Sequence, residues 1–164
     1  MIFGMTLFTF VHVVLSLVGI FSGFVVLFGL LTGKGLEGWT AVFLATTVLT
    51  SVTGFLFPFQ RFLPSHAVGI LSLIVLAVAI FARYRRHLAG AWRRIYAISA
   101  VIALYFNFFV LIVQLFLKVP ALNAIAPTQS ETPFKVAQII ALMAFVVLGI
   151  LAAIRSRHEQ LRPA

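Results

Sequence analysis

The sequence predicts an all-α, polytopic membrane protein: one membrane domain, residues 1–164, folded as a five-transmembrane-helix bundle. Three observations predict it. The chain is 63% hydrophobic and only 9% charged, whereas soluble domains are about 45–50% apolar and about a quarter charged. Its apolar residues form runs long enough to cross a bilayer, which takes about 20 residues as a helix. Its basic residues fall between those runs on alternate links.

Five segments qualify as spans: residues 5–32, 39–57, 66–82, 95–117 and 134–154. Each must be helical, because lipid offers no partner for exposed backbone amides. The first run carries no basic residue ahead of it and exceeds the apolar core of a signal peptide, so we expect a retained first span. Glycine or proline punctuates the longer links, as in "GKGLEG" over residues 33–38.

Positive charge predicts the orientation. With five spans, one side holds nine of the twelve Lys and Arg residues: Lys34, Arg83, Arg85, Arg86, Arg93, Arg94, Arg155, Arg157 and Arg162. The other side holds Arg61, Lys118 and Lys135. The positive-inside rule then places the N-terminus outside and the C-terminus in the cytoplasm. We therefore expect a multi-pass protein of the cell inner (plasma) membrane, and the tight loops with this asymmetry favour a bacterial source.

The most basic link is residues 83–94, "RYRRHLAGAWRR". We expect its arginines to contact anionic lipid headgroups at the cytoplasmic face: Arg83, Arg85, Arg86, Arg93 and Arg94. Docking of a soluble partner is the alternative interpretation. A net charge of +9 would suggest nucleic acid in a soluble protein. Here the charge lies between hydrophobic runs, so no nucleic-acid partner is expected.

Polar side chains inside the spans gather in the predicted outer half: His12, Thr50, Ser51, Thr53, His66, Gln114 and Gln138, with Asn107 near mid-membrane. The cytoplasmic half carries almost nothing polar beyond its rim. Because polar groups are costly in hydrocarbon, they usually face the bundle interior. This one-sidedness predicts an outward-opening pocket with five candidate binding residues: His12, His66, Asn107, Gln114 and Gln138. Residues 123–133, "NAIAPTQSETP", are its candidate lid.

Two stripes of small residues predict helix packing. His12, Ser16, Gly19 and Gly23 fall on one face of the first span, and Gly19 and Gly23 have the GxxxG spacing that lets helices approach closely. The second span carries a stripe of threonines. Their hydroxyls can bond to carbonyls of their own helix, so packing explains them without a ligand.

His12 and His66 suggest a redox site. Two neutral imidazoles from different helices can hold the iron of a b-type haem. Five helices with an outside N-terminus also resemble, in topology alone, the cytochrome b subunits of some respiratory oxidoreductases. His12 lies about 10 Å deeper than His66 at 1.5 Å per residue, however, which opposes ligation of one haem. Quinone binding by a histidine and an amide is the softer form of this hypothesis.

The function we expect first is an accessory or scaffold subunit of a membrane complex, and haem or quinone binding is the alternative. Small-solute transport is the second alternative. It ranks below haem or quinone binding because no span contains an acidic residue or an evident proline break. Zinc ligation by His12, His66 and Glu131 is a further hypothesis. Hydrolytic chemistry is disfavoured, since the chain has no cysteine, no aspartate and no paired carboxylates.

Overall fold

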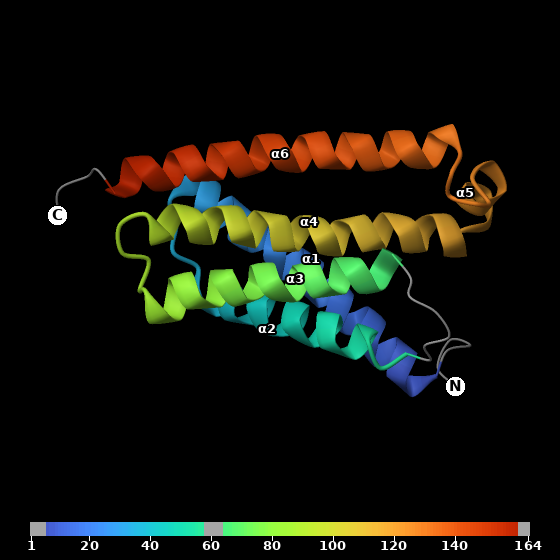
Figure 1. The fold of residues 1–164 in the computed structure, drawn as a ribbon, viewed down its shortest axis with the longest axis horizontal. Helices are drawn as coiled ribbons and strands as arrows, with labels where there is room; N and C mark the ends of the chain where they lie inside the picture. Colours follow the sequence, from blue (N-terminus) through green and yellow to red (C-terminus); the bar gives the residue numbers. More distant parts are fainter. Residues whose placement is uncertain (1–5, 58–63, 161–164) are drawn as a thin grey trace.

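The computed structural model describes residues 6–57 and 64–160, and every regular element within them is helical. These elements are α1 (Leu7–Thr32), α2 (Glu37–Gly54), α3 (Pro64–Ile80), the π-helical turn η1 (Phe81–Arg85), α4 (Trp92–Lys118), α5 (Pro120–Ile125) and α6 (Thr132–Gln160). The long helices run in alternating directions along one axis (Figure 1). The all-α prediction is confirmed for this part of the chain.

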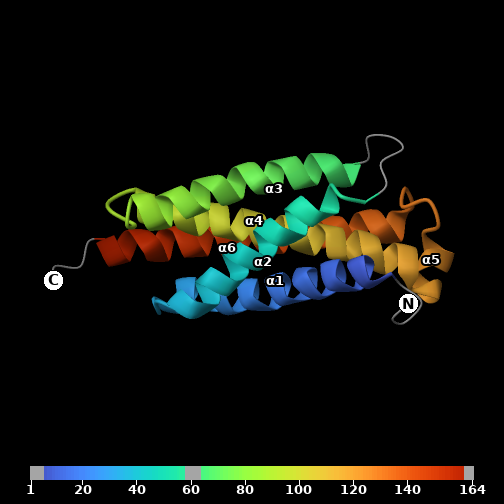
Figure 2. The same ribbon diagram turned by 90° about the horizontal axis from the view of Figure 1, so that it is seen from below.

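Four of these helices are long and apolar enough to cross a membrane: α1, α3 continued by η1, α4 and α6. Helix α2 is not among them, because Glu37 and six Thr or Ser residues reduce its apolar character. It runs obliquely between α1 and α3, as Figure 2 shows. The chain is therefore a multi-pass membrane-type bundle, with four spans by this criterion and α2 as a fifth long helix packed among them.

The helix ends differ from the predicted ones by a few residues at most places. The predicted span 39–57 is a helix over Glu37–Gly54, and the predicted span 134–154 extends over Thr132–Gln160. The first helix begins at Leu7, because the Thr6 hydroxyl accepts a hydrogen bond from the backbone of Thr9 at 3.2 Å. Residue 5 of the first predicted span and residues 58–63 of the predicted link before the third span lie outside the described ranges.

Helix α5 was not predicted. It forms within the link between the last two predicted spans and starts at Pro120. Proline suits a first helical position, because its fixed φ is helical and its missing N–H would have no intrahelical partner there. The link is thus a folded cap on one end of the bundle (Figure 1).

The tightest packing joins α1 to α2 and α4 around two glycines. A Cβ atom on Gly23 would lie 2.5 Å from Leu104 Cδ1 and 2.9 Å from a ring carbon of Phe43. A Cβ atom on Gly19 would lie 3.2 Å from Asn107 Nδ2. The predicted small-residue packing face of the first helix is therefore confirmed, and it places α1 close to the centre of α4.

Helix α6 joins the bundle along a narrow seam. Its buried residues are Ala141, Phe145, Ala152 and Ser156. The Phe145 ring lies within an aromatic group formed by Phe24, Tyr105 and Phe108, at centroid distances of 5.5–6.0 Å. Only 17% of the most apolar window of α6 is buried, against 33% for α1 and for α4. Most of α6 therefore presents apolar side chains to the surroundings of the bundle.

The alternating helices bring most positive charge to one end. This basic end is formed by the end of α1, the start of α2, η1, the start of α4 and the end of α6 (Figure 1). It carries Lys34, Arg83, Arg85, Arg86, Arg93, Arg94, Arg155 and Arg157. Lys118 and Lys135 lie at the other end, here called the opposite end. Arg61 and Arg162 fall outside the described residues.

Replacing Gly23 with valine should loosen the contact of α1 with α2 and α4. The new side chain would overlap Leu104 and the Phe43 ring, and overpacking of this kind costs about 1–3 kcal/mol. We expect a lower thermal unfolding midpoint for Gly23→Val in detergent micelles. Gly38→Val is the matched control, because nothing lies within 4 Å of a Cβ atom there. Equal midpoints for the two variants would show that this close approach is not required.

Candidate functional site

The predicted binding residues all lie in the half of the bundle nearer the opposite end, but they occupy separate helix interfaces. His12 is on α1 facing α2, His66 is on α3 beside the end of α2, and Asn107 joins α4 to α2. Gln138 joins α6 to α4, and Gln114 is exposed. The alternating topology thus gathers the predicted binding residues at one end of the bundle. Helix packing separates them, because those at helix interfaces contact neighbouring helices and not one another.

His12 is held by Thr53 across the interface of α1 and α2. Its Nδ1 lies 2.8 Å from Thr53 Oγ1, and the Phe57 ring stands edge-on to the imidazole at 5.0 Å. The Thr53 hydroxyl donates its single hydrogen to the Leu49 carbonyl at 2.7 Å. His12 Nδ1 must then be the donor to Thr53, so the lone pair of a neutral imidazole lies on Nε2.

His66 lies on a different side of α2. It is 8% exposed, and its ring packs against Phe55 at 5.9 Å. Thr53 and Phe55 are two residues apart at the end of α2, so at 100° per residue their side chains point about 160° apart. The two imidazoles therefore contact opposite sides of this helix end. Within the described residues, no group of three or more His, Asp or Glu side chains could hold a metal ion, so zinc ligation by His12, His66 and Glu131 gains no support.

Asn107 makes the deepest of these polar contacts. Its Nδ2 donates to Thr47 Oγ1 at 3.3 Å, and Thr47 is fully buried. On the next turn of α2, the hydroxyl oxygens of Ser51 and Ser72 lie 3.2 Å apart and link α2 to α3. The polar side chains of α2 thus provide one hydrogen-bonded contact each to α1, α3 and α4.

Amide side chains near the opposite end bond to carbonyls of α4. Gln138 Nε2 donates to Phe109 O at 3.3 Å, and its buried Oε1 has no hydrogen-bond partner. Gln129 Nε2 donates to Val113 O at 2.9 Å, and Asn123 Nδ2 donates to Phe116 O at 3.2 Å. Two residues of the predicted lid, Asn123 and Gln129, therefore fasten the link to the end of α4.

Another polar residue of this link, Glu131, organises the turn before α6. Its carboxylate accepts hydrogen bonds from the Thr128 hydroxyl at 2.8 Å and from the backbone amides of Thr128 and Ser130. Loss of solvent raises the pKa of this carboxyl, but the hydrogen bonds outweigh that effect and lower the pKa below its ordinary value. Glu131 is thus an ionised turn-forming residue.

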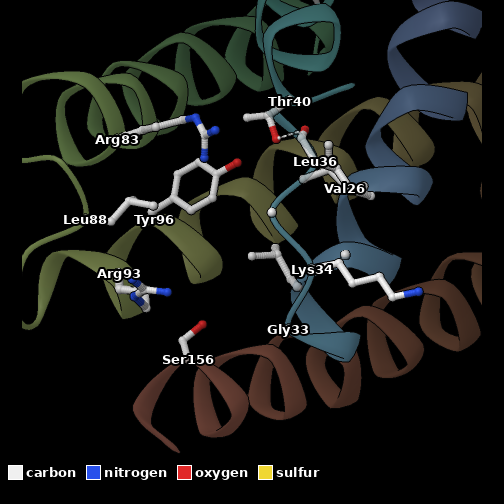
Figure 3. A pocket seen from close by; sticks show the side chains of 13 residues that line it. Val26, Gly33, Lys34, Leu36, Thr40, Arg83, Leu88, Arg93, Tyr96 and Ser156 are labelled. Carbon is white, nitrogen blue, oxygen red and sulfur yellow. Dashed lines mark hydrogen bonds between the residues drawn. The ribbon is translucent and has the colours of Figure 1, made fainter. Parts of the chain in front are cut away.

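A second polar region lies at the basic end, where the sequence predicted almost nothing polar beyond the rim. Thr40, Tyr96 and Ser156 lie at that rim, and all three are buried there, with exposures of 3%, 2% and 3%. They line a pocket of about 100 Å³, shown in Figure 3. Each lies about one turn inside a helix end on the same predicted side of the membrane, and this shared depth was the signal in the sequence.

The arginines predicted to contact lipid headgroups divide into two groups. Arg83 and Arg93 are half-buried and line this pocket. Arg85, Arg86 and Arg94 are exposed, as expected of headgroup contacts. The Arg86 guanidinium lies 5.2 Å from the centroid of the Trp92 ring. Burial thus distinguishes Arg83 and Arg93 from the other three arginines, which the charge pattern of the sequence could not do.

The contact of Asn107 with Thr47 can be measured by a double-mutant cycle with Asn107→Ala and Thr47→Val. Interhelical hydrogen bonds in membranes average about 0.6 kcal/mol and reach about 1.7 kcal/mol in such cycles. We expect a coupling free energy of that size in the unfolding of the detergent-solubilised chain. The control cycle pairs Asn107→Ala with Thr53→Val, which contacts His12 instead, and should be additive. Equal coupling in both cycles would contradict a direct contact.

Comparison with known proteins gives no functional precedent for this arrangement. No protein-family model, curated protein or solved structure matches the chain. The features of the molecule that can indicate a function are its two polar regions and the apolar surface of α6.

Proposed function

We propose that this protein is an accessory or scaffold subunit of a complex in the bacterial inner membrane. The observation that carries the proposal is the use made of its polar groups. Three of the predicted binding residues, His12, Asn107 and Gln138, each form a side-chain hydrogen bond to a neighbouring helix. A bundle whose polar side chains hold its own helices together is suited to a structural role.

The large apolar face of α6 supports an assembly role. Side chains along its length are about half exposed or more, among them Ile139, Ile140, Met143, Val147 and Ile150. In a membrane such a face contacts either lipid tails or another helix. Helix α6 touches the bundle along one seam only, so the remaining faces are open to a partner subunit.

We propose further that α2 is a fifth span. Its 18 residues would extend about 27 Å, close to the hydrocarbon thickness of about 30 Å. The link after α1 and the turn η1 line one pocket through Leu36 and Arg83. Both therefore lie at the basic end, which supports the proposal, because a spanning α2 would return the chain to the opposite end before α3 begins. The positive-inside rule would place this end in the cytoplasm and the N-terminus outside.

Haem or quinone binding is the second candidate, and one observation favours it. The bond from His12 Nδ1 to Thr53 orients the imidazole and leaves Nε2 as the free lone pair, an arrangement that metal-ligating histidines use. The position of His66 across the end of α2 opposes a shared haem. A quinone needs only one histidine at one carbonyl, so this softer form fits the geometry better.

The proposed topology can be tested with single cysteines, because the chain has none. We expect Gly35→Cys, in the exposed link after α1, to react with a membrane-impermeant maleimide only after cells are opened. Ser130→Cys, before α6, should react in intact cells. Ala89→Cys, in the loop before α4, should behave as Gly35→Cys does. If Gly35→Cys and Ala89→Cys report different sides, α2 does not span the membrane.

The scaffold role predicts a defined neighbour on α6. A photo-crosslinking side chain at Ile140, which is 64% exposed, should give one discrete protein adduct in intact cells. The same side chain at Met143 should give the same adduct, and at the exposed Ile74 of α3 it should not. A chain that crosslinks only to lipid from all three positions would contradict the proposal. A red purified protein whose Soret band disappears in His12→Ala would support the redox candidate in its place.

A further inference from the structure

The pocket at the basic end combines buried hydrogen-bond donors with positive charge. Its walls come from α1, α2, η1, the loop before α4, α4 itself and α6. Figure 3 shows the Tyr96 hydroxyl and the Arg83 guanidinium on one wall and Ser156 on the facing side, with Arg93 between them. No carboxylate is among the described side chains that line it. Residues 33–35 form an exposed rim where two of three residues are glycines.

The Tyr96 hydroxyl is the first sign of a missing partner. Tyr96 is 2% exposed, and its buried oxygen has no hydrogen-bond partner. Thr40 and Arg83 approach this hydroxyl, but not with the distance and angle of a hydrogen bond, and the Thr40 hydroxyl already donates to Leu36 O at 2.9 Å. Buried hydroxyls without partners are uncommon and costly. Tyr96 therefore offers an O–H donor to whatever enters the pocket.

Arg83 is the second sign. It lies in the π-helical turn η1, a rare geometry that recurs at functional sites. Its half-buried guanidinium stacks near the rings of Tyr84 and Tyr96, at 5.8 and 5.5 Å, and forms no ion pair with a described carboxylate. A cation withdrawn from water without a counter-ion is unfavourable. Arg83 and the Tyr96 hydroxyl thus make the same demand, an anionic hydrogen-bond acceptor.

The chain has few carboxylates to meet that demand. Its three acidic residues are Glu37, Glu131 and Glu159. Glu131 lies in the turn at the opposite end, and Glu37 is exposed and does not line the pocket. The side chain of Glu159 is outside the described structure, three residues beyond Ser156, so it is the internal competitor that an experiment must test.

We propose that this pocket binds a phosphate group, held by the Arg83 guanidinium and the Tyr96 hydroxyl, with Ser156 and Arg93 on the facing wall. A guanidinium presents paired N–H donors that match phosphate oxygens. A volume of about 100 Å³ accommodates an oxyanion of several oxygens, given about 30 Å³ per water. The Lys34 ammonium lies outside, over the Phe28 ring at 5.9 Å. The site does not depend on the chain having a partner subunit.

Two sources supply this chemistry, an anionic phospholipid headgroup and free phosphate. Thermal unfolding of the delipidated full chain in neutral detergent distinguishes them when inorganic phosphate, short-chain phosphatidic acid or short-chain phosphatidylcholine is added. We expect phosphatidic acid to raise the unfolding midpoint by several degrees in a saturable way, because a ligand that binds only the folded state stabilises it. Phosphatidylcholine, whose phosphate is masked by choline, should have no such effect. A matching response to inorganic phosphate would assign a general phosphate site, and its absence would assign a lipid headgroup site.

Variants test the residues. Tyr96→Phe should weaken phosphatidic acid binding roughly tenfold, as expected for one lost hydrogen bond to a charged group. Without ligand it should unfold at an equal or higher temperature, because it removes an unpartnered hydroxyl. Arg83→Gln should weaken binding by tenfold or more. The controls are Tyr84→Phe and Arg85→Gln, which remove the same groups from exposed neighbours outside the pocket and should bind normally.

Three results would overturn the proposal. The first is that neither phosphate compound shifts the unfolding midpoint. The second is that Arg85→Gln weakens binding as much as Arg83→Gln, which would indicate unspecific attraction. The third is strong coupling between Glu159→Gln and Arg83→Gln in the unfolding of the ligand-free chain, which would identify Glu159 as the counter-ion. Should Arg83→Gln fail to fold, Tyr96→Phe still decides between the outcomes, because it differs from the native chain by one oxygen.

Discussion

The packing of this bundle depends on the hydroxyl groups of α2. Helix α2 is the one long helix of the described residues that falls short of the apolar character of a membrane span, and hydroxyls that are shielded from water must be bonded within the protein. Several bond to carbonyls of their own helix, as Thr46 does to Val42. Others reach across to neighbours: Thr53 to α1, Ser51 to α3 and Thr47 to α4. A helix that carries these groups is most stable when neighbouring helices cover it, and this constraint fixes which helices surround it.

The glycines of α1 make that arrangement possible. Asn107 can reach Thr47 only if α1 leaves room beside both side chains, and Gly19 lies directly opposite them. One turn later, Gly23 admits the side chains of Phe43 and Leu104. Helix α6 has no comparable polar stripe and packs through a single seam. The bundle is therefore unequal: α1, α2 and α4 are bound by close approach and by hydrogen bonds between side chains, whereas α6 is bound mainly by apolar contact, with hydrogen bonds from Gln138 to Phe109 O and from Arg155 to Thr32 O.

Much of the fold could be predicted from the sequence, because apolar runs, glycine spacing and alternating charge are local or one-dimensional signals. The helix α5 could not, because a proline-bounded link gives the same local signal whether it is extended or helical. The candidate site was predicted less well. Depth in the membrane placed His12 and His66 at one end, but depth says nothing about direction around a neighbouring helix. The end of α2 lies between the two histidines, because His12 contacts Thr53 and His66 contacts Phe55. Only packing geometry reveals that arrangement.

The two ends of the bundle differ in how their buried polar groups are bonded, and this difference changes where function should be sought. Near the opposite end, histidine and amide side chains looked reactive in the sequence, yet the bonds of His12, Asn107 and Gln138 go to neighbouring helices. At the basic end, Arg83 and Tyr96 looked like ordinary interfacial residues, yet they surround an open space with a cation and a donor hydroxyl. A polar group that is already satisfied contributes to stability, whereas one that is buried and unsatisfied is available to a ligand. Thr50 Oγ1 and Gln138 Oε1 near the opposite end are also buried without a partner, but the Tyr96 hydroxyl stands beside a cation in a pocket. The phosphate-sized pocket at the basic end, rather than the histidines, is therefore the better candidate for recognition.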